Sequence, residues 1–254
     1  MIGISIKPTI GIGDALQYSS LPENYFRATG RKLIDVSRPW FFDHNPFVDR
    51  DSVPTKTVEM WNFSPTQYEY PNPRKDGKPA VYLSNAEIWC AVLGVPCVMN
   101  RPRLYRYEDV PFERRTHILL HTSGISHGEM PEHIVNHIIA KYGRMSLWHV
   151  GPRNSRQKDY GLPNIITPTL WNFAELVSKA RMFISMDSGP SWISACYPDV
   201  ITKIVRTKPT DPNEFLNWVP LEVRNIHSHW CDRARSEYNV TEDDIGHTWS
   251  YRRI

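Results

Sequence analysis

The clearest indication of the fold class lies in residues 173–195, which read FAELVSKARMFISMDSGPSWISA. The apolar periodicity predicts a helix over 172–180 and a short buried strand over 182–186. A tight loop at 187–190 follows, and a second helix starts at Ser191. A helix and a strand joined by short loops form the repeating unit of a parallel sheet. We therefore expect an α/β fold.

The same alternation continues in both directions along the chain. Strands are predicted over 2–6, 32–36, 57–63, 97–100, 117–121, 146–150 and 201–205, and helices over 15–29, 85–93 and 131–142. Gly30 stands where a helix C-cap is expected. Residues 101–115 are polar and basic, and we interpret them as a connector. The chain is therefore expected to hold two domains, residues 1–105 and residues 106–254.

The composition excludes several classes of protein. Thirty Lys and Arg against 27 Asp and Glu give a net charge of +3, which is too small to favour nucleic acid by itself. No apolar run approaches the roughly 18 residues of a transmembrane helix. Four cysteines in 254 residues do not form a disulfide framework. The N-terminus lacks the pattern of a signal peptide, so we expect a cytoplasmic protein.

Three short segments each follow a predicted strand and precede a predicted helix: GIGD at 11–14, TSGISHG at 122–128 and DSGP at 187–190. In parallel α/β sheets these positions lie at the carboxyl edge, where ligands bind. Glycines, hydroxyls and helix N-termini suit a phosphate group. Each segment also has a local interpretation, as a helix cap or a solvated loop. The agreement of all three favours a phosphate-bearing ligand.

Other candidate sites have weaker support. The segment at 11–14 lacks the third glycine of a dinucleotide fingerprint, because Leu16 stands in its place. The cluster HSHWCD at 227–232 lacks a second ligand pair at the spacing of zinc sites, so we predict neither a metal nor a cofactor. Arginines alternate with Tyr105 and Tyr107 in the connector, which suits nucleic acid or an anionic glycan, although a solvated linker is favoured.

Several of these segments resemble, in order, the motifs of the heptosyltransferase-like glycosyltransferases (glycosyltransferase family 9). The similar segments are GIGD at 11–14, KLIDV at 32–36, NPFVD at 45–49, LLHTS at 119–123 with Pro131, the region 173–195, and KPTDP at 208–212. The resemblance implies a GT-B fold, with two Rossmann-like lobes whose parallel sheets face a central cleft. It implies that lobe 1–105 binds the acceptor and that lobe 106–254 binds a nucleotide-sugar, with the C-terminal tail packing back on the first lobe.

The implied function is an inverting, metal-independent transfer of a sugar from a nucleotide-sugar to an acceptor hydroxyl. The acceptor would be a glycan or a lipid-linked molecule, in surface-glycan or lipopolysaccharide-type synthesis. Asp14 matches the general base of the family. The implied donor-binding residues are Gly11, Gly13, Thr122, Ser123, Gly124, Asp187, Ser188, Gly189 and Pro190.

Two positions depart from the family pattern. Gly128 and Trp192 stand where many members carry a Lys and a His. A non-catalytic relative that binds a nucleotide or glycan is therefore one alternative. A glycosyltransferase that acts on modified DNA is another, suggested by the basic segment 101–115.

Overall fold

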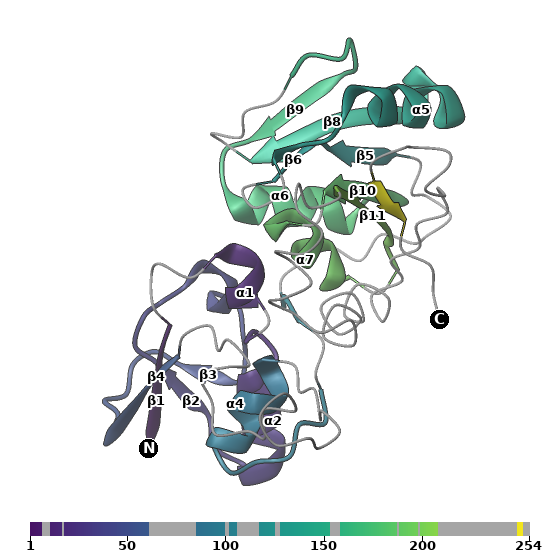
Figure 1. The fold of residues 1–254 in the computed structure, drawn as a ribbon. Coiled ribbons are helices and arrows are strands. Elements are labelled where there is room, and N and C mark those ends of the chain that lie inside the picture. Colours follow the sequence, from purple (N-terminus) through teal and green to yellow (C-terminus); the bar gives the residue numbers. More distant parts are fainter. Residues whose placement is uncertain are drawn as a thin grey trace, which may run out of the picture. The chain divides into compact units, whose positions relative to one another are not determined.

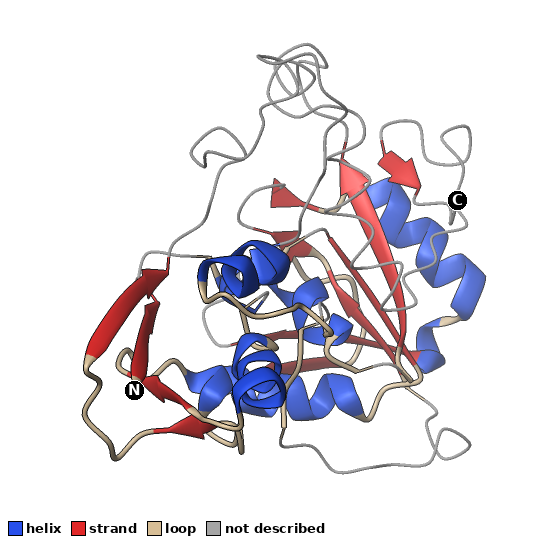
Figure 2. Cartoon of the chain, turned by 90° about the horizontal axis from the view of Figure 1, so that it is seen from below, coloured by secondary structure: helices blue, strands red, loops and turns tan. Residues whose placement is uncertain are grey.

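In the computed structural model of the chain, the described residues form two α/β units. The described residues are 1–6, 11–16, 18–60, 85–99, 102–105, 117–124, 128–152, 158–186, 188–197, 199–207 and 248–250 (Figure 2, where the other residues are grey). The first unit holds the described residues up to Tyr105, and the second holds those from His117 onward.

The first unit contains a four-stranded parallel sheet in the order β3-β2-β1-β4. Its elements are β1 (Ile2–Ile6), α1 (Ile12–Leu16), α2 (Leu21–Thr29), β2 (Leu33–Asp35), the short 3₁₀ helix η1 (Trp40–Phe42), β3 (Val48–Asp49), β4 (Lys56–Met60) and α4 (Asn85–Val92). In this sheet β2 lies beside β1 on one edge, and β4 lies beside β1 on the other. This is the order of the first four strands of a Rossmann fold.

The helix predicted over 15–29 is in fact two helices. Helix α1 already begins at Ile12, since the Ala15 amide donates to the Gly11 carbonyl at 2.9 Å. Gly13 therefore lies inside a helix, and the prediction of a glycine-rich loop at 11–14 was wrong beyond Gly11. The chain turns before α2, and this turn places the buried Tyr18 edge-on against Trp89 of α4, with ring centroids 6.2 Å apart.

Two further predictions meet a clear outcome in this unit. Gly30 caps α2 with φ 68°, and its amide donates to the Phe26 carbonyl at 2.7 Å, so the predicted cap is confirmed. The strand predicted over 97–100 is wrong in its described part, 97–99. The amides of Val98 and Met99 donate to the side chain of Asn24 instead of to a neighbouring strand.

The second unit contains a six-stranded sheet in the order β12-β11-β10-β5-β8-β9. Its strands are β5 (Ile118–His121), β8 (Leu147–Pro152), β9 (Asn164–Thr167), β10 (Met182–Met186), β11 (Ile201–Thr207) and β12 (Thr248–Ser250). All pair in parallel except β12, which is antiparallel to β11. The order is that of a complete Rossmann sheet that starts at β5. A separate two-stranded hairpin is formed by β6 (Ser123–Gly124) and β7 (Gly128–Glu129).

Helices cover both faces of this sheet (Figure 1). Helix α5 (Glu132–Tyr142) lies on one face, where Leu120 and Ile184 pack against its apolar side, and the 3₁₀ helix η3 (Arg144–Ser146) follows it. Helices α6 (Leu170–Ser178) and α7 (Gly189–Ala195) lie on the other face, where Phe183 contacts Phe173 of α6. Neighbouring residues of β10 thus pack against helices on opposite faces of the sheet, as strand alternation requires. The predicted α/β fold with two parallel sheets is confirmed. In the described part of the chain, no helix is long and apolar enough to cross a membrane.

Candidate nucleotide site at the carboxyl edge of the second sheet

The candidate site lies where the order of the second sheet reverses. From β5 the chain moves to β8 and β9 on one side, and then returns to place β10 on the other side. Ser185 pairs with His121, so the carboxyl ends of β5 and β10 are level. Ligands of doubly wound sheets bind at such a reversal. Two of the three predicted loops, 122–128 and 187–190, follow these strand ends, and the structure describes 122–124 and 188–190 there.

The two loops touch each other. A Cβ added to Gly124 would lie 3.1 Å from the Cβ of Ser188 and 3.5 Å from the Cβ of Met186. Gly124 is held in the β6–β7 hairpin, in which it pairs with Gly128. The loop predicted over 122–128 is thus partly an ordered hairpin that presses on the start of α7.

The start of α7 offers fewer amide donors than its sequence suggests. The Ser188 amide donates to the Ser191 hydroxyl at 3.3 Å, and the Ser191 amide donates to the Ser188 carbonyl at 3.0 Å. Pro190 has no amide hydrogen. Of the amides of residues 188–191, only that of Gly189 makes no hydrogen bond with a described residue. The Ser188 hydroxyl donates to the Met186 carbonyl at 3.2 Å, so an anion here would meet the Gly189 amide as its donor.

Two buried histidines lie beneath this edge. His149 of β8 is 1% exposed, and its Nε2 lies 2.9 Å from the hydroxyl of Thr122. His121 is also buried, and burial lowers its pKa to about 3, helped by the nearby His149. Burial likewise lowers the pKa of His149, against an opposing effect of Asp159. Both rings are therefore neutral near pH 7.

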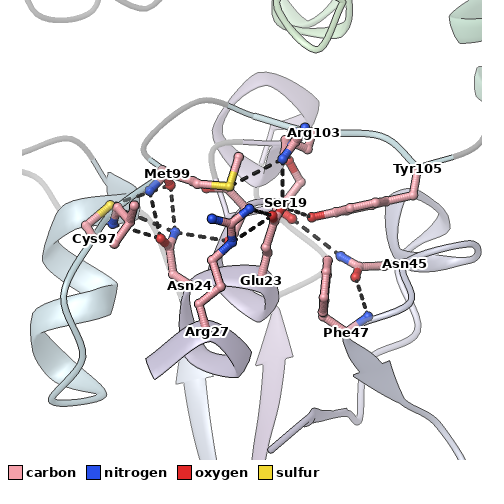
Figure 3. A network of polar contacts seen from close by, with 12 residues as sticks. Ser19, Glu23, Asn24, Arg27, Asn45, Phe47, Cys97, Met99, Arg103 and Tyr105 are labelled. Atoms are coloured by element: carbon pink, nitrogen blue, oxygen red, sulfur yellow. Dashed lines mark hydrogen bonds and ion pairs between the residues drawn. The ribbon is translucent and has the colours of Figure 1, made fainter. Parts of the chain in front are cut away.

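A polar network that was not predicted from the sequence lies in the first unit, centred on the buried Glu23 (Figure 3). The buried Glu23 carboxylate accepts hydrogen bonds from Arg27 at 2.7 Å, from Arg103 at 2.8 Å and from the Tyr105 hydroxyl at 2.8 Å. Burial raises the pKa of Glu23, but the bonds from Tyr105 and Arg27 and the charge of Arg103 outweigh it, so the pKa lies below its usual value. Burial and the bond to Glu23 raise the pKa of Tyr105 well above its usual value.

This network changes the interpretation of the basic connector. Arg103 and Tyr105 were candidates for contact with nucleic acid, yet both are bonded to Glu23 inside their own unit. The Arg103 amide also donates to the Ser19 hydroxyl at 2.7 Å. The spacing of Glu23 and Arg27 on one helix face was the available signal in the sequence.

The other predicted site residues have mixed outcomes. The backbone of Asp14 lies in α1, but its side chain is outside the described residues, as are Asp187, residues 106–116 and residues 227–232. Trp192 is 6% exposed and belongs to the core under α7. Among the described residues, no group of three His, Cys, Asp or Glu side chains could hold a metal ion.

The chain is similar in fold to several solved glycosyltransferases. The chain is similar to the iron-containing dodecameric glycosyltransferase TibC from enterotoxigenic E. coli H10407, with a TM-score of 0.58 and 17% identity over 80% of this chain and 57% of TibC. It is similar to the glycosyl transferase family 9 protein from Veillonella parvula DSM 2008, with a TM-score of 0.53 and 13% identity over 83% of this chain and 81% of that one. It is also similar to E. coli heptosyltransferase WaaC with ADP, with a TM-score of 0.56 and 12% identity over 92% of this chain and 99% of WaaC.

The similarity therefore lies in the fold and not in the sequence. No protein-family model and no curated protein matches the chain. The chain spans little more than half of TibC, at 57%. The predicted resemblance to the heptosyltransferase fold is confirmed at this level.

Proposed function

We propose that the chain is a glycosyltransferase that moves a sugar from a nucleotide-sugar to an acceptor hydroxyl. The observation that carries this proposal is the contact between Gly124 and Ser188 at the strand-order reversal of the second sheet. The same fold in WaaC is solved with ADP, and in TibC with ADP-D-beta-D-heptose. We further propose a cytoplasmic location, on the cysteine content alone.

The donor diphosphate is assigned to the part-exposed residues of this edge. These are Ser123, Gly124, Ser188, Gly189 and Pro190. The Gly189 amide and the Ser123 hydroxyl supply hydrogen-bond donors to the phosphate oxygens, and stabilise the charge that develops on the leaving diphosphate. The Ser188 hydroxyl donates to the Met186 carbonyl at 3.2 Å, so Ser188 contributes to the shape of the edge and not a donor. Asp187 is assigned to the donor as an acceptor for its hydroxyl groups.

Catalysis is assigned to Asp14, which follows β1 in the first unit. The acceptor oxygen attacks the anomeric carbon of the donor while the bond from that carbon to the diphosphate breaks. The Asp14 carboxylate takes the proton of the acceptor hydroxyl, and no metal takes part. Attack opposite to the leaving group inverts the anomeric configuration. Gly11 and Gly13 are assigned to the donor with less support, since Gly13 lies inside α1.

Titration calorimetry with ADP, UDP and their sugar conjugates tests the donor site. Turnover is then measured by mass spectrometry with glycan and lipid-linked acceptors. We expect Asp14→Asn to abolish turnover and to leave nucleotide affinity within about threefold, as for loss of a general base. Asp51→Asn, at an exposed aspartate of the same unit, is the matched control. Near-normal turnover by Asp14→Asn would refute the assigned base.

The burial of Trp192 favours one alternative, a non-catalytic nucleotide-binding relative. Trp192 takes the position of a family histidine, and at 6% exposure it packs in the core instead of facing a donor. Nucleotide binding without turnover on any acceptor would support this alternative. A glycosyltransferase that acts on modified DNA has less support, because Arg103 and Tyr105 are bonded to Glu23.

A further inference from the structure

Thr122 is held from within the protein. The sequence suggests that its hydroxyl contacts the donor diphosphate, yet the side chain is 1% exposed and its hydroxyl lies 2.9 Å from His149 Nε2. The geometry follows from strand alternation: Leu120 is paired with His149, and Thr122 lies on the same face two residues further along. The hydroxyl is thus directed below the edge of the sheet.

His149 is itself firmly placed. Its amide donates to the Pro163 carbonyl at 2.8 Å, and its ring meets the Tyr160 ring edge-on, with centroids 5.5 Å apart. The ring is 1% exposed. A buried ring between two strands and an aromatic neighbour has one orientation available, so its Nε2 is a fixed partner for Thr122.

The fixed position of Thr122 also limits where the next two residues can lie. The Thr122 carbonyl accepts the Met130 amide at 2.6 Å, and Gly124 lies against Ser188. Between these two anchors stands Ser123, which is part-exposed and whose hydroxyl makes no hydrogen bond with a described residue. The chain thus fixes both neighbours of the one hydroxyl in segment 122–124 that a ligand can reach.

We propose that His149 is a positioning residue of the donor site. Through its bond to the Thr122 hydroxyl it fixes Ser123 and the adjoining main chain at the seat of the nucleotide diphosphate. Thr122 therefore acts on the donor indirectly. This inference rests on the proposed function, because it needs the nucleotide at this edge.

A double-mutant cycle on ADP affinity tests the proposal. Thr122→Val and His149→Phe each remove one partner of the bond while keeping most of the packing. We expect each to weaken ADP binding about tenfold, and the double variant to be no weaker than either alone, because they break the same interaction. We expect His149→Gln and Thr122→Ser, which keep polar groups at the bond, to bind within about threefold of the wild type.

A matched control separates positioning from general stability. Thr202→Val removes another buried threonine hydroxyl of the same unit, one that is bonded to Ser194. We expect it to lower the melting temperature about as much as Thr122→Val and to leave ADP affinity unchanged. Thermal unfolding shows which variants fold. If Thr122→Val or His149→Phe does not fold, Thr122→Ser and His149→Gln still test the proposal.

The outcomes distinguish the two proposals. If the wild type binds ADP and the cycle is additive, or the single variants bind normally, the positioning role of His149 is overturned and the proposed function stands. If Thr202→Val weakens binding as much as Thr122→Val, the effect is one of stability and the positioning role is likewise overturned. If the wild type binds neither ADP nor UDP, the proposed function fails and this inference fails with it.

Discussion

The main chain of Gly124 lies so close to Ser188 that a Cβ at position 124 would be 3.1 Å from the Cβ of Ser188. The two residues follow β5 and β10, the strands that flank the reversal of strand order. Real Cβ contacts are seldom this short, so one of the two segments would have to move to admit a side chain. The donor site proposed at this edge depends on that close approach.

Gly124→Ala should therefore push the hairpin away from α7. We expect a loss of about 1–2 kcal/mol in stability from overpacking and a loss of ADP affinity of at least fivefold. Calorimetric titration and thermal unfolding measure the two effects. Gly3→Ala is the control, because its Cβ would lie 2.7 Å from the Pro54 Cβ in the first unit. It should lower stability without weakening ADP binding. Wild-type affinity in Gly124→Ala would contradict the assignment.

The Glu23 network should contribute measurably to the stability of the first unit. Glu23→Gln keeps the size of the side chain but removes the negative charge of the carboxylate. That carboxylate accepts hydrogen bonds from Arg27, Arg103 and Tyr105. We expect a loss of about 1–3 kcal/mol, typical of a hydrogen bond to a buried charged group. Glu132→Gln is the control, since Glu132 and Lys158 form a pair whose side chains are 61% and 50% exposed. Its loss should stay within about 0.5 kcal/mol. Urea unfolding followed by tryptophan fluorescence gives both values, and equal losses would contradict the role of Glu23.

Asn24 should control the order of the segment that follows α4. Its side chain bonds the amides of Val98 and Met99 at 2.9 and 2.8 Å, and donates to the Met99 carbonyl at 2.6 Å. We expect Asn24→Ala to speed amide hydrogen exchange in peptides that cover 97–104, because these groups lose their partner. Mass spectrometry measures the exchange. Asn172→Ala, at an exposed residue of the second unit, should leave it unchanged. Unaltered exchange in Asn24→Ala would show that other contacts hold the segment.

Stability should fall as the pH drops below about 6.5. His121 has a pKa of about 3 in the folded chain, while an unfolded histidine has a pKa of about 6.5. Between these values the unfolded state binds a proton that the folded state does not. Each unit by which the pH falls therefore lowers the free energy of unfolding by up to about 1.4 kcal/mol. His149, whose pKa is also lowered by burial, acts in the same direction.

Urea unfolding between pH 5 and 7 measures the slope of the free energy of unfolding against pH. This interval lies above the range in which most carboxylates titrate. His121→Leu removes the buried imidazole and keeps an apolar contact for Phe173, so we expect a shallower slope. His133→Asn, at an exposed position of α5, is the matched control for the loss of a histidine. A slope that does not change in His121→Leu would contradict the prediction.

Local patterns in the sequence determined much of the fold. The strands at Ile2–Ile6 and Met182–Met186 were predicted with their observed bounds, and Gly30 ends its helix as expected. Short apolar runs and a left-handed glycine act within a few residues, so a single sequence reveals them. The order of the motifs, from 11–14 to 208–212, also led to the heptosyltransferase fold that the solved structures share.

Tertiary contacts decided the details of the site. Asn24 keeps residues 98 and 99 out of a strand, and Glu23 binds Arg103 and Tyr105 across 80 and 82 positions of the chain. His149 turns the Thr122 hydroxyl inward across 27 positions. Such bonds join segments that meet only when the sheet and its helices have packed, and they leave no periodic signal in the sequence. The sequence thus determined which loops lie at the ligand edge, while packing decided which of their side chains a ligand can reach.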